Sequence, residues 1–335
     1  MATVAVSDKI IQVRNLKKHF PLTSGFFATL TSRAPAKTLK AIDGVSFDIA
    51  EGETIGLAGE SGCGKTTTAK VMVRLYDPSE GEISFRGENI AYLKGKDLRK
   101  FRKNAQMVFQ DPYESLNPRF TVANTVEEPL IIHGIKDRDE RTERIVRALE
   151  IAGLRPAEDY LDRFPHEMSG GQRQRIAIAR ALVLEPKFMV ADEPVSMLDV
   201  SIRAGVLNLL RGLTRDMGLA SLYISHDLSL IRYMCDRTAI MYLGRIVEMG
   251  PTEKLIADPY HPYTQVLLSA VPSSDPEHRK PALQIEGEVP SPIDLPPGCR
   301  FHPRCRKAMP ICKELEPPTV EVAPNHTAEC HLFAR

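Results

Sequence analysis

The sequence lacks three features that would each place it in a large class of proteins. No run approaches the roughly 18 uncharged apolar residues that a membrane-spanning helix needs. The formal net charge is only +1, with 26% charged residues, which disfavours nucleic-acid binding by bulk electrostatics without excluding it. The start of the chain has no basic segment followed by an apolar core, so we expect no secretory signal. We therefore expect any membrane role to be peripheral.

A glycine-rich segment at residues 59–66 lies between an apolar run and a helix-forming run. Strand, glycine loop and helix are the context that a phosphate-binding P-loop requires, although a plain glycine turn before a helix has the same outline. The glycines let backbone N–H groups turn toward one point, and the helix N-terminus adds unpaired N–H groups. The motif predicts that Lys65 reaches the β- and γ-phosphates of a nucleotide and that the Thr66 hydroxyl binds Mg²⁺. The predicted nucleotide contacts here are Gly59, Glu60, Ser61, Gly62, Cys63, Gly64, Lys65, Thr66 and Thr67.

Before the P-loop, two strand-like runs at residues 10–13 and 39–49 predict an antiparallel β layer, with a loop over residues 21–37 between them. Phe20 lies at the edge of that loop. It is a candidate to stack on adenine, and the alternative is a ring packed under the β layer.

After the P-loop helix, a hairpin-like segment at residues 81–87 precedes a short strand that ends in Gln110. Residues 111–168 then show helical periodicity, which predicts a helical insertion between two halves of an α/β core. The insertion ends at Ser169, Gly170, Gly171 and Gln172, which precede another helix-like run. This is a second helix start that can face an anion, although a plain capped helix is the simpler interpretation.

Two further apolar runs end in polar residues. Residues 188–191 predict a buried parallel strand that ends at Asp192 and Glu193, and residues 222–225 predict another that ends at His226. Ligands bind at the carboxyl ends of such strands, so Asp192 is a candidate for Mg²⁺ and Glu193 for orienting or deprotonating a water. The alternatives are an exposed helix-capping aspartate and a structural histidine. Asp199 begins an amphipathic helix between them.

Taken in order, these segments resemble the P-loop, Q-loop, signature, Walker B, D-loop and H-loop of an ABC-transporter ATPase over residues 10–250. The signature begins with Met168 where the common form has leucine. The resemblance implies an α/β P-loop NTPase fold: a RecA-like core with an antiparallel β subdomain and an inserted helical subdomain. It also implies two subunits packed head to tail, which enclose ATP and Mg²⁺ between the P-loop of one and the signature of the other.

The same resemblance implies a role for each site residue. Lys65, Thr66 and Asp192 serve phosphate and Mg²⁺, and Gln110 joins the metal. Glu193 is the general base and His226 holds the γ-phosphate. The residues that complete the partner's nucleotide site are Ser169, Gly170, Gly171, Gln172 and Asp199.

The composition changes beyond residue 250, because 15 of the 25 prolines lie in the last 85 residues, which argues against a helical domain there. We predict an ATP-binding domain at residues 1–250 and an extension at residues 251–335. Residues 261–264 and 296–305 resemble the C-terminal extension of oligopeptide and dipeptide importer ATPases, of the F-type subunit. That resemblance implies an ATPase at the cytoplasmic face of a bacterial inner membrane that energises peptide uptake.

The implied partners are a second homologous ATPase subunit, different or identical, two transmembrane permeases and a periplasmic or lipoprotein binding protein, with no nucleic acid. Nickel, glutathione, opines, antimicrobial peptides and sugars stay open as substrates. An ABC ATPase that works on nucleic acid or ribosomes is disfavoured, because the chain has one cassette and no long coiled-coil insertion. A non-catalytic regulatory member is disfavoured by Glu193 and His226.

Four cysteines in the extension have a spacing that matches no compact zinc finger: Cys299, Cys305, Cys312 and Cys330. A long nucleotide-binding chain does not fit a disulfide scaffold either. The importer resemblance implies a [4Fe–4S] cluster on these four residues, with zinc and free thiols as alternatives. We expect such a cluster to be structural, fixing a proline-rich segment that lacks a core of its own.

Overall fold

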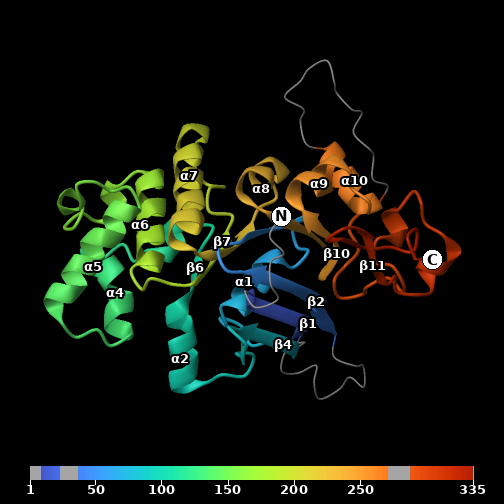
Figure 1. Cartoon of the computed structure of the whole chain (residues 1–335), viewed down its shortest axis with the longest axis horizontal. Helices are drawn as coiled ribbons and strands as arrows, with labels where there is room; N and C mark the ends of the chain where they lie inside the picture. Colours follow the sequence, from blue (N-terminus) through green and yellow to red (C-terminus); the bar gives the residue numbers. More distant parts are fainter. Residues whose placement is uncertain (1–8, 23–36, 271–286, 335) are drawn as a thin grey trace.

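The structure, a computed structural model, describes residues 9–22, 37–270 and 287–334. Within these ranges it forms a four-stranded sheet and an eight-stranded sheet, with helices around them (Figure 1). Helices α4, α5 and α6 gather at one end of the long axis, and β11 with the C-terminal segment lies at the other. No helix of the described residues has the length and apolar character needed to cross a membrane.

The four-stranded sheet is antiparallel, in the order β2-β1-β4-β5. Its strands are β1 (Lys9–Pro21), β2 (Thr38–Ala50), β4 (Glu80–Phe85) and β5 (Glu88–Asn89). The side chains of Ile11, Val13 and Ile83 are fully buried, so one face of this sheet packs on the core. The predicted loop between β1 and β2 falls largely on residues 23–36, outside the described residues.

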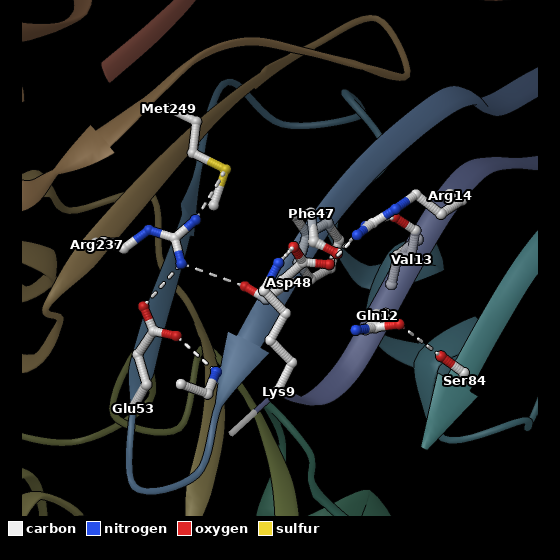
Figure 2. Close-up of polar contacts among 11 residues, drawn as sticks. Lys9, Gln12, Val13, Arg14, Phe47, Asp48, Glu53, Ser84, Arg237 and Met249 are labelled. Carbon is white, nitrogen blue, oxygen red and sulfur yellow. Dashed lines mark hydrogen bonds and ion pairs between the residues drawn. The ribbon is translucent and has the colours of Figure 1, made fainter. Parts of the chain in front are cut away.

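An arginine of the larger sheet ties the two sheets together (Figure 2). Arg237 donates to Glu53 Oε1 at 3.0 Å and to the backbone oxygen of Asp48 at 3.3 Å. Glu53 Oε2 in turn accepts from the backbone N–H of Ala50 at 2.7 Å. Lys9 forms an ion pair with Asp48, so the joint extends to the start of β1.

The eight-stranded sheet has the order β11-β12-β10-β9-β3-β8-β7-β6. Strands β6, β7, β8, β3 and β9 run parallel, and β10, β11 and β12 continue the sheet antiparallel. Every residue of β3, β7 and β8 is buried, as in parallel sheets covered on both faces. The bounds are β3 (Thr54–Ala58), β6 (Ala105–Val108), β7 (Phe188–Asp192), β8 (Ala220–Ile224), β9 (Arg237–Tyr242), β10 (Arg245–Pro251), β11 (Thr319–Ala323) and β12 (His326–Glu329).

The helices follow capping and periodicity signals in the sequence. In α7, for example, Val206, Leu210 and Leu213 are buried on one face, and the helix ends at Gly218 with a left-handed φ of 62°. The bounds are α1 (Lys65–Met72), α2 (Gly95–Asn104), α3 (Pro112–Ser115), α4 (Val122–Ile132), α5 (Arg138–Ile151), α6 (Gly170–Leu182), α7 (Val200–Met217), α8 (Leu228–Met234), α9 (Thr252–Ala257) and α10 (Pro262–Ser269).

Residues 111–168 contain α3, α4 and α5, which pack with α6 around an apolar core of their own. Val126, Leu149 and Ile176 lie at its centre and are fully buried. This helical block is joined to the sheets through α6 and through the segment after β6.

The C-terminal extension is built onto the larger sheet. Strand β12 pairs with β10, and Tyr263 and Phe301 share an apolar cluster with Tyr242 of β9. The predicted boundary at residue 250 falls inside β10, so hydrogen bonding and packing run across it. The extension is thus stabilised by the core of the ATP-binding part.

Candidate active site

The sheet order brings the predicted site segments to one edge. Strands β3, β8, β7 and β6 are parallel neighbours, so their carboxyl ends lie side by side. The P-loop follows β3, Asp192 ends β7, and Gln110 and His226 follow β6 and β8. A pocket of about 380 Å³ lies at this edge. Its lining residues are Leu39, Ala41, Ser61, Gly62, Gly64, Lys65, Thr66, Thr67, Gln110, Glu193, His226 and Pro292.

At two positions the P-loop backbone is packed too tightly for any residue other than glycine. At Gly59, with φ 152°, an added Cβ would lie 2.2 Å from the Met241 backbone oxygen. At Gly64, with φ 111°, it would lie 2.2 Å from the Ala41 backbone oxygen. Gly64 is also the N-cap of α1, where no side chain of the described residues caps the helix. The first N–H groups of α1 are therefore available to an anionic ligand in the pocket.

Lys65 is the buried cation of this pocket. Its side chain is only 7% exposed, and Nζ donates to the backbone oxygens of Gly59 at 2.7 Å and Glu60 at 2.9 Å. These two carbonyls hold the Lys65 ammonium group against the P-loop, where Lys65 lines the pocket.

Asp192 has the properties of a magnesium ligand. It is 3% exposed, and burial raises the pKa of its carboxyl, while a hydrogen bond from Thr66 lowers it and the charge of Glu193 raises it. Asp192 Oδ1 is buried and has no hydrogen-bond partner among the described residues. A buried carboxylate oxygen without a partner, next to a threonine hydroxyl, matches the oxygen ligands that Mg²⁺ prefers. The residues present therefore fit the ion.

Glu193 connects three strand ends. Gln110 Nε2 donates to Glu193 Oε2 at 3.2 Å, and His226 Nδ1 lies 3.1 Å from Glu193 Oε1. The backbone of Glu193 has a positive φ of 45° and donates to the Ile224 oxygen at 3.0 Å, so the residue is tied to the neighbouring β8. The arrangement presents one carboxylate to the pocket, with a donor on each side.

The signature residues lie apart from this pocket. Ser169 is exposed and forms a capping box with Gln172: Ser169 Oγ accepts from the Gln172 N–H at 3.3 Å, and Gln172 Oε1 accepts from the Ser169 N–H at 2.9 Å. Gly171 packs on α7, where a Cβ would lie 2.4 Å from Ile202 Cγ2. Asp199, at the start of α7, is also exposed. Among the described residues, the signature segment of this chain therefore does not line the P-loop pocket of the same chain.

Four of the nucleotide contacts predicted at the P-loop side are not among the pocket's lining residues in the described part of the chain: Phe20, Gly59, Glu60 and Cys63. Phe20 packs edge-on against Tyr76, with ring centroids 5.6 Å apart, and Lys18 Nζ lies 4.9 Å from the Phe20 ring centre. The Gly59 backbone oxygen accepts from Lys65 Nζ instead, at 2.7 Å. Cys63 is buried, and the Glu60 side chain is turned toward the extension.

Sequence reasoning missed three lining residues: Leu39, Ala41 and Pro292. The first two belong to β2, and Pro292 comes from the extension, where its backbone oxygen accepts from the Lys40 N–H at 3.2 Å. Their contribution depends on how β2 and the extension pack, and no local motif signals it.

The four cysteines of the extension lie close enough to affect one another electrostatically. Burial raises the pKa of Cys299 to about 12, and the Cys299 N–H donates to the Cys312 oxygen at 2.8 Å. However, the described residues contain no group of three or more His, Cys, Asp or Glu side chains arranged to hold a metal ion. All four are free thiols in this arrangement, so the predicted iron–sulfur site is not supported by it.

Comparisons with known proteins identify the family of this chain. The ABC transporter family matches residues 42–196, and the oligopeptide/dipeptide transporter C-terminal region matches residues 247–312. The oligopeptide transport ATP-binding protein AppF of Bacillus subtilis strain 168 is 48% identical over 335 residues, covering 99% of this chain and 100% of AppF. The chain belongs to the ABC transporter ATPase family. This ABC ATPase is therefore matched along nearly its whole length.

Two solved structures share its fold. The dimeric, post-hydrolysis ATP-binding cassette MJ0796 with ADP and phosphate has a TM-score of 0.62 and 28% identity, covering 72% of this chain and 98% of the cassette. The protein cbiO1 of Clostridium perfringens, part of the transporter complex cbiONQ, has a TM-score of 0.63 and 28% identity, covering 75% and 92%. The ABC ATPase thus has the cassette fold.

Proposed function

We propose that this ABC ATPase hydrolyses ATP to energise the uptake of di- and oligopeptides across a bacterial inner membrane. The observation that carries the ATPase assignment is the Glu193 carboxylate, held by Gln110 and His226 at the mouth of a P-loop pocket. The peptide assignment is supported by the match of the extension to the oligopeptide/dipeptide transporter region and by the name of AppF.

Each site residue has one task in this proposal. The P-loop N–H groups and Lys65 bind the phosphates of ATP. Thr66, Asp192 and Gln110 hold Mg²⁺, which supplies positive charge to the phosphate oxygens when bound. Glu193 accepts the proton of the attacking water. His226 binds the γ-phosphate next to it.

The nucleotide site is completed by a second subunit. The start of α6, at the exposed Ser169 followed by Gly170 and Gly171, can donate N–H groups to the phosphates on a facing P-loop, and Asp199 at the start of α7 is exposed as well. ATP between two subunits favours their association, and hydrolysis removes the phosphate that contacts both. The second subunit is a related but different ATPase, with a homodimer as the alternative.

The other partners in this proposal are two transmembrane permeases and a periplasmic or lipoprotein binding protein. The ATPase binds the permeases from the cytoplasmic face of the membrane. Substrate choice rests with these partners, so nickel, glutathione, opines, antimicrobial peptides and sugars are the competing cargoes.

Reconstitution tests the proposal. The complex is purified from native membranes, its subunits are identified, and ATPase activity is measured in proteoliposomes with each candidate cargo and its binding protein. We expect peptides to raise the ATPase rate. Stimulation by nickel, glutathione or a sugar alone would keep the ATPase role and replace the cargo.

The [4Fe–4S] cluster stays a prediction with its own test. Its support is the resemblance of the extension to that of oligopeptide importer ATPases, and the arrangement of the four thiols in the described residues adds none. Anaerobic purification, an iron assay and a visible spectrum decide between a cluster, zinc and free thiols. A colourless protein without iron would discard the cluster.

A further inference from the structure

One P-loop residue, Glu60, is held by the C-terminal extension. Arg304 forms a bidentate ion pair with its carboxylate: Nη1 lies 2.8 Å from Oε2 and Nη2 lies 3.2 Å from Oε1. Tyr263 holds the backbone of the same residue, since its hydroxyl oxygen accepts from the Glu60 N–H at 2.9 Å. The carbonyl of Glu60 is one of the two that bind Lys65 Nζ. Glu60 therefore links the extension directly to the buried lysine of the pocket.

The groups that hold Glu60 are themselves fixed. Tyr263 is fully buried, with its ring centroid 4.6 Å from that of Tyr242 and 5.4 Å from that of Phe301. The Arg304 side chain is 7% exposed, and its Nη1 also lies 3.4 Å from the Tyr242 hydroxyl. Tyr242 ends β9, which is hydrogen-bonded to the P-loop strand β3. The extension and the strand below the P-loop thus form one packed support.

Neither Arg304 nor Tyr263 lines the nucleotide pocket in the described residues. Any effect on ATP must therefore pass through the loop backbone. A bidentate arginine–carboxylate pair fixes orientation as well as distance, and small displacements of phosphate-binding groups are costly to binding and catalysis.

We propose that Arg304 and Tyr263 are positioning residues for ATP, which set the P-loop through Glu60 and make the C-terminal extension a working part of the ATPase site. This inference rests on the proposed ATP hydrolysis. It assigns to the extension a task at the nucleotide, in addition to any contact with transporter partners.

The test uses the full chain and a matched control. Arg304→Gln removes the ion pair to Glu60. Arg245→Gln makes the same chemical change at another arginine that ties the extension to the core, through Glu316 at 2.6 Å and Glu329 at 3.2 Å, away from the pocket. The KM for ATP, kcat and the melting temperature are measured for both. We expect Arg304→Gln to raise the KM about tenfold and Arg245→Gln to leave it within about twofold, at comparable melting temperatures.

Three further variants separate positioning from general loosening. Tyr263→Phe removes one oxygen and should raise the KM about threefold without unfolding the chain, and it decides the matter if Arg304→Gln does not fold. Arg304→Lys keeps the charge without the fork and should recover only part of the loss. Combining Glu60→Gln with Arg304→Gln should cost little more than Arg304→Gln alone, because both act through one contact.

The outcomes are distinguishable. If Arg304→Gln and Tyr263→Phe hydrolyse ATP with the KM of the unaltered chain, the positioning role is wrong and the ATPase function stands. A rise in KM that is equally large in Arg245→Gln also overturns the positioning role. If the unaltered chain does not hydrolyse ATP, the proposed function itself fails.

Discussion

Two helix N-termini in this ABC ATPase have glycine at or next to their first residue, yet they are built in opposite ways. Helix α1 starts after Gly64, whose backbone has a left-handed conformation, and no side chain in the described residues caps the helix. Helix α6 starts after Ser169, which caps it through the reciprocal pair with Gln172. The first opens into a pocket of its own chain, and the second is exposed. One chain thus has an uncapped helix start at a pocket and a separate helix start with a capping box.

The largest expected effect tests whether the residues of the P-loop pocket, at the start of α1, carry out ATP hydrolysis. In Glu193→Gln, the amide keeps the size of the side chain but cannot accept a proton, so we expect turnover to fall about a thousandfold. ATP affinity should stay within about twofold, because the P-loop and Lys65 are unchanged. Steady-state ATPase assays and titration with a fluorescent ATP analogue measure the two quantities. Rapid hydrolysis by this variant would exclude Glu193 as the base.

The next effect separates the two N-termini directly. Lys65→Ala removes the buried cation and should lower the ATP affinity of the isolated subunit. Ser169→Arg places a bulky side chain at the exposed start of α6, so it should leave that affinity unchanged but lower turnover about a hundredfold and prevent ATP-dependent association. Binding titrations and light scattering measure these effects. Weakened ATP binding by isolated Ser169→Arg would contradict the division between the two helices.

The contrast between these helices also shows what sequence could predict. The α/β order, the strand ends and the caps depend on neighbouring residues, so β3, β7, β8 and the start of α6 could be placed from local pattern. Pro292 in the pocket and Arg304 on the P-loop depend on packing between segments far apart in the chain. The same holds for Phe20, which packs against Tyr76 because the segment between α1 and β4 lies beside β1, where the Ser79 N–H donates to the Lys17 oxygen.

Burial of the Asp192 carboxyl, the candidate magnesium ligand, predicts a smaller effect on stability. The pKa of Asp192 is raised above its unfolded value, so the folded chain binds more protons between the two pKa values and its stability falls as pH rises through that window. That loss persists at neutral pH. We expect Asp192→Asn to stabilise the nucleotide-free chain by about 1–2 kcal/mol at neutral pH and to abolish the further stabilisation by Mg²⁺ and ATP. Thermal unfolding with and without Mg²⁺ and ATP checks both, and a variant still stabilised by Mg²⁺ and ATP would remove Asp192 from the site.

The start of α10 extends the comparison to a third helix N-terminus, whose cap is a buried titratable group. The effect expected there is the smallest. His261 caps α10: its side-chain Nδ1 accepts from the Tyr263 backbone N–H at 3.1 Å, and the His261 backbone N–H donates to Glu248 Oε2 at 2.9 Å. Burial lowers the pKa of His261 from 6.5 to about 4, although the charge of Glu248 raises it. Between these values the unfolded chain binds more protons, so stability falls as pH falls from 6.5 toward 4.

From pH 7.5 to 5.5, protonation of this histidine in the unfolded chain should lower the unfolding free energy by about 1 kcal/mol. This loss of stability begins below about pH 7 and is complete at about pH 4. His261→Asn keeps a cap that accepts a hydrogen bond but does not titrate, so urea unfolding should lose about 1 kcal/mol less than the unaltered chain over the same pH range. His331→Asn, at a histidine outside this contact, is the matched control and should keep the full loss. An identical pH dependence for His261→Asn and the unaltered chain would mean that the cap is not titrating, and that α10 differs from α6 only in which residue caps it.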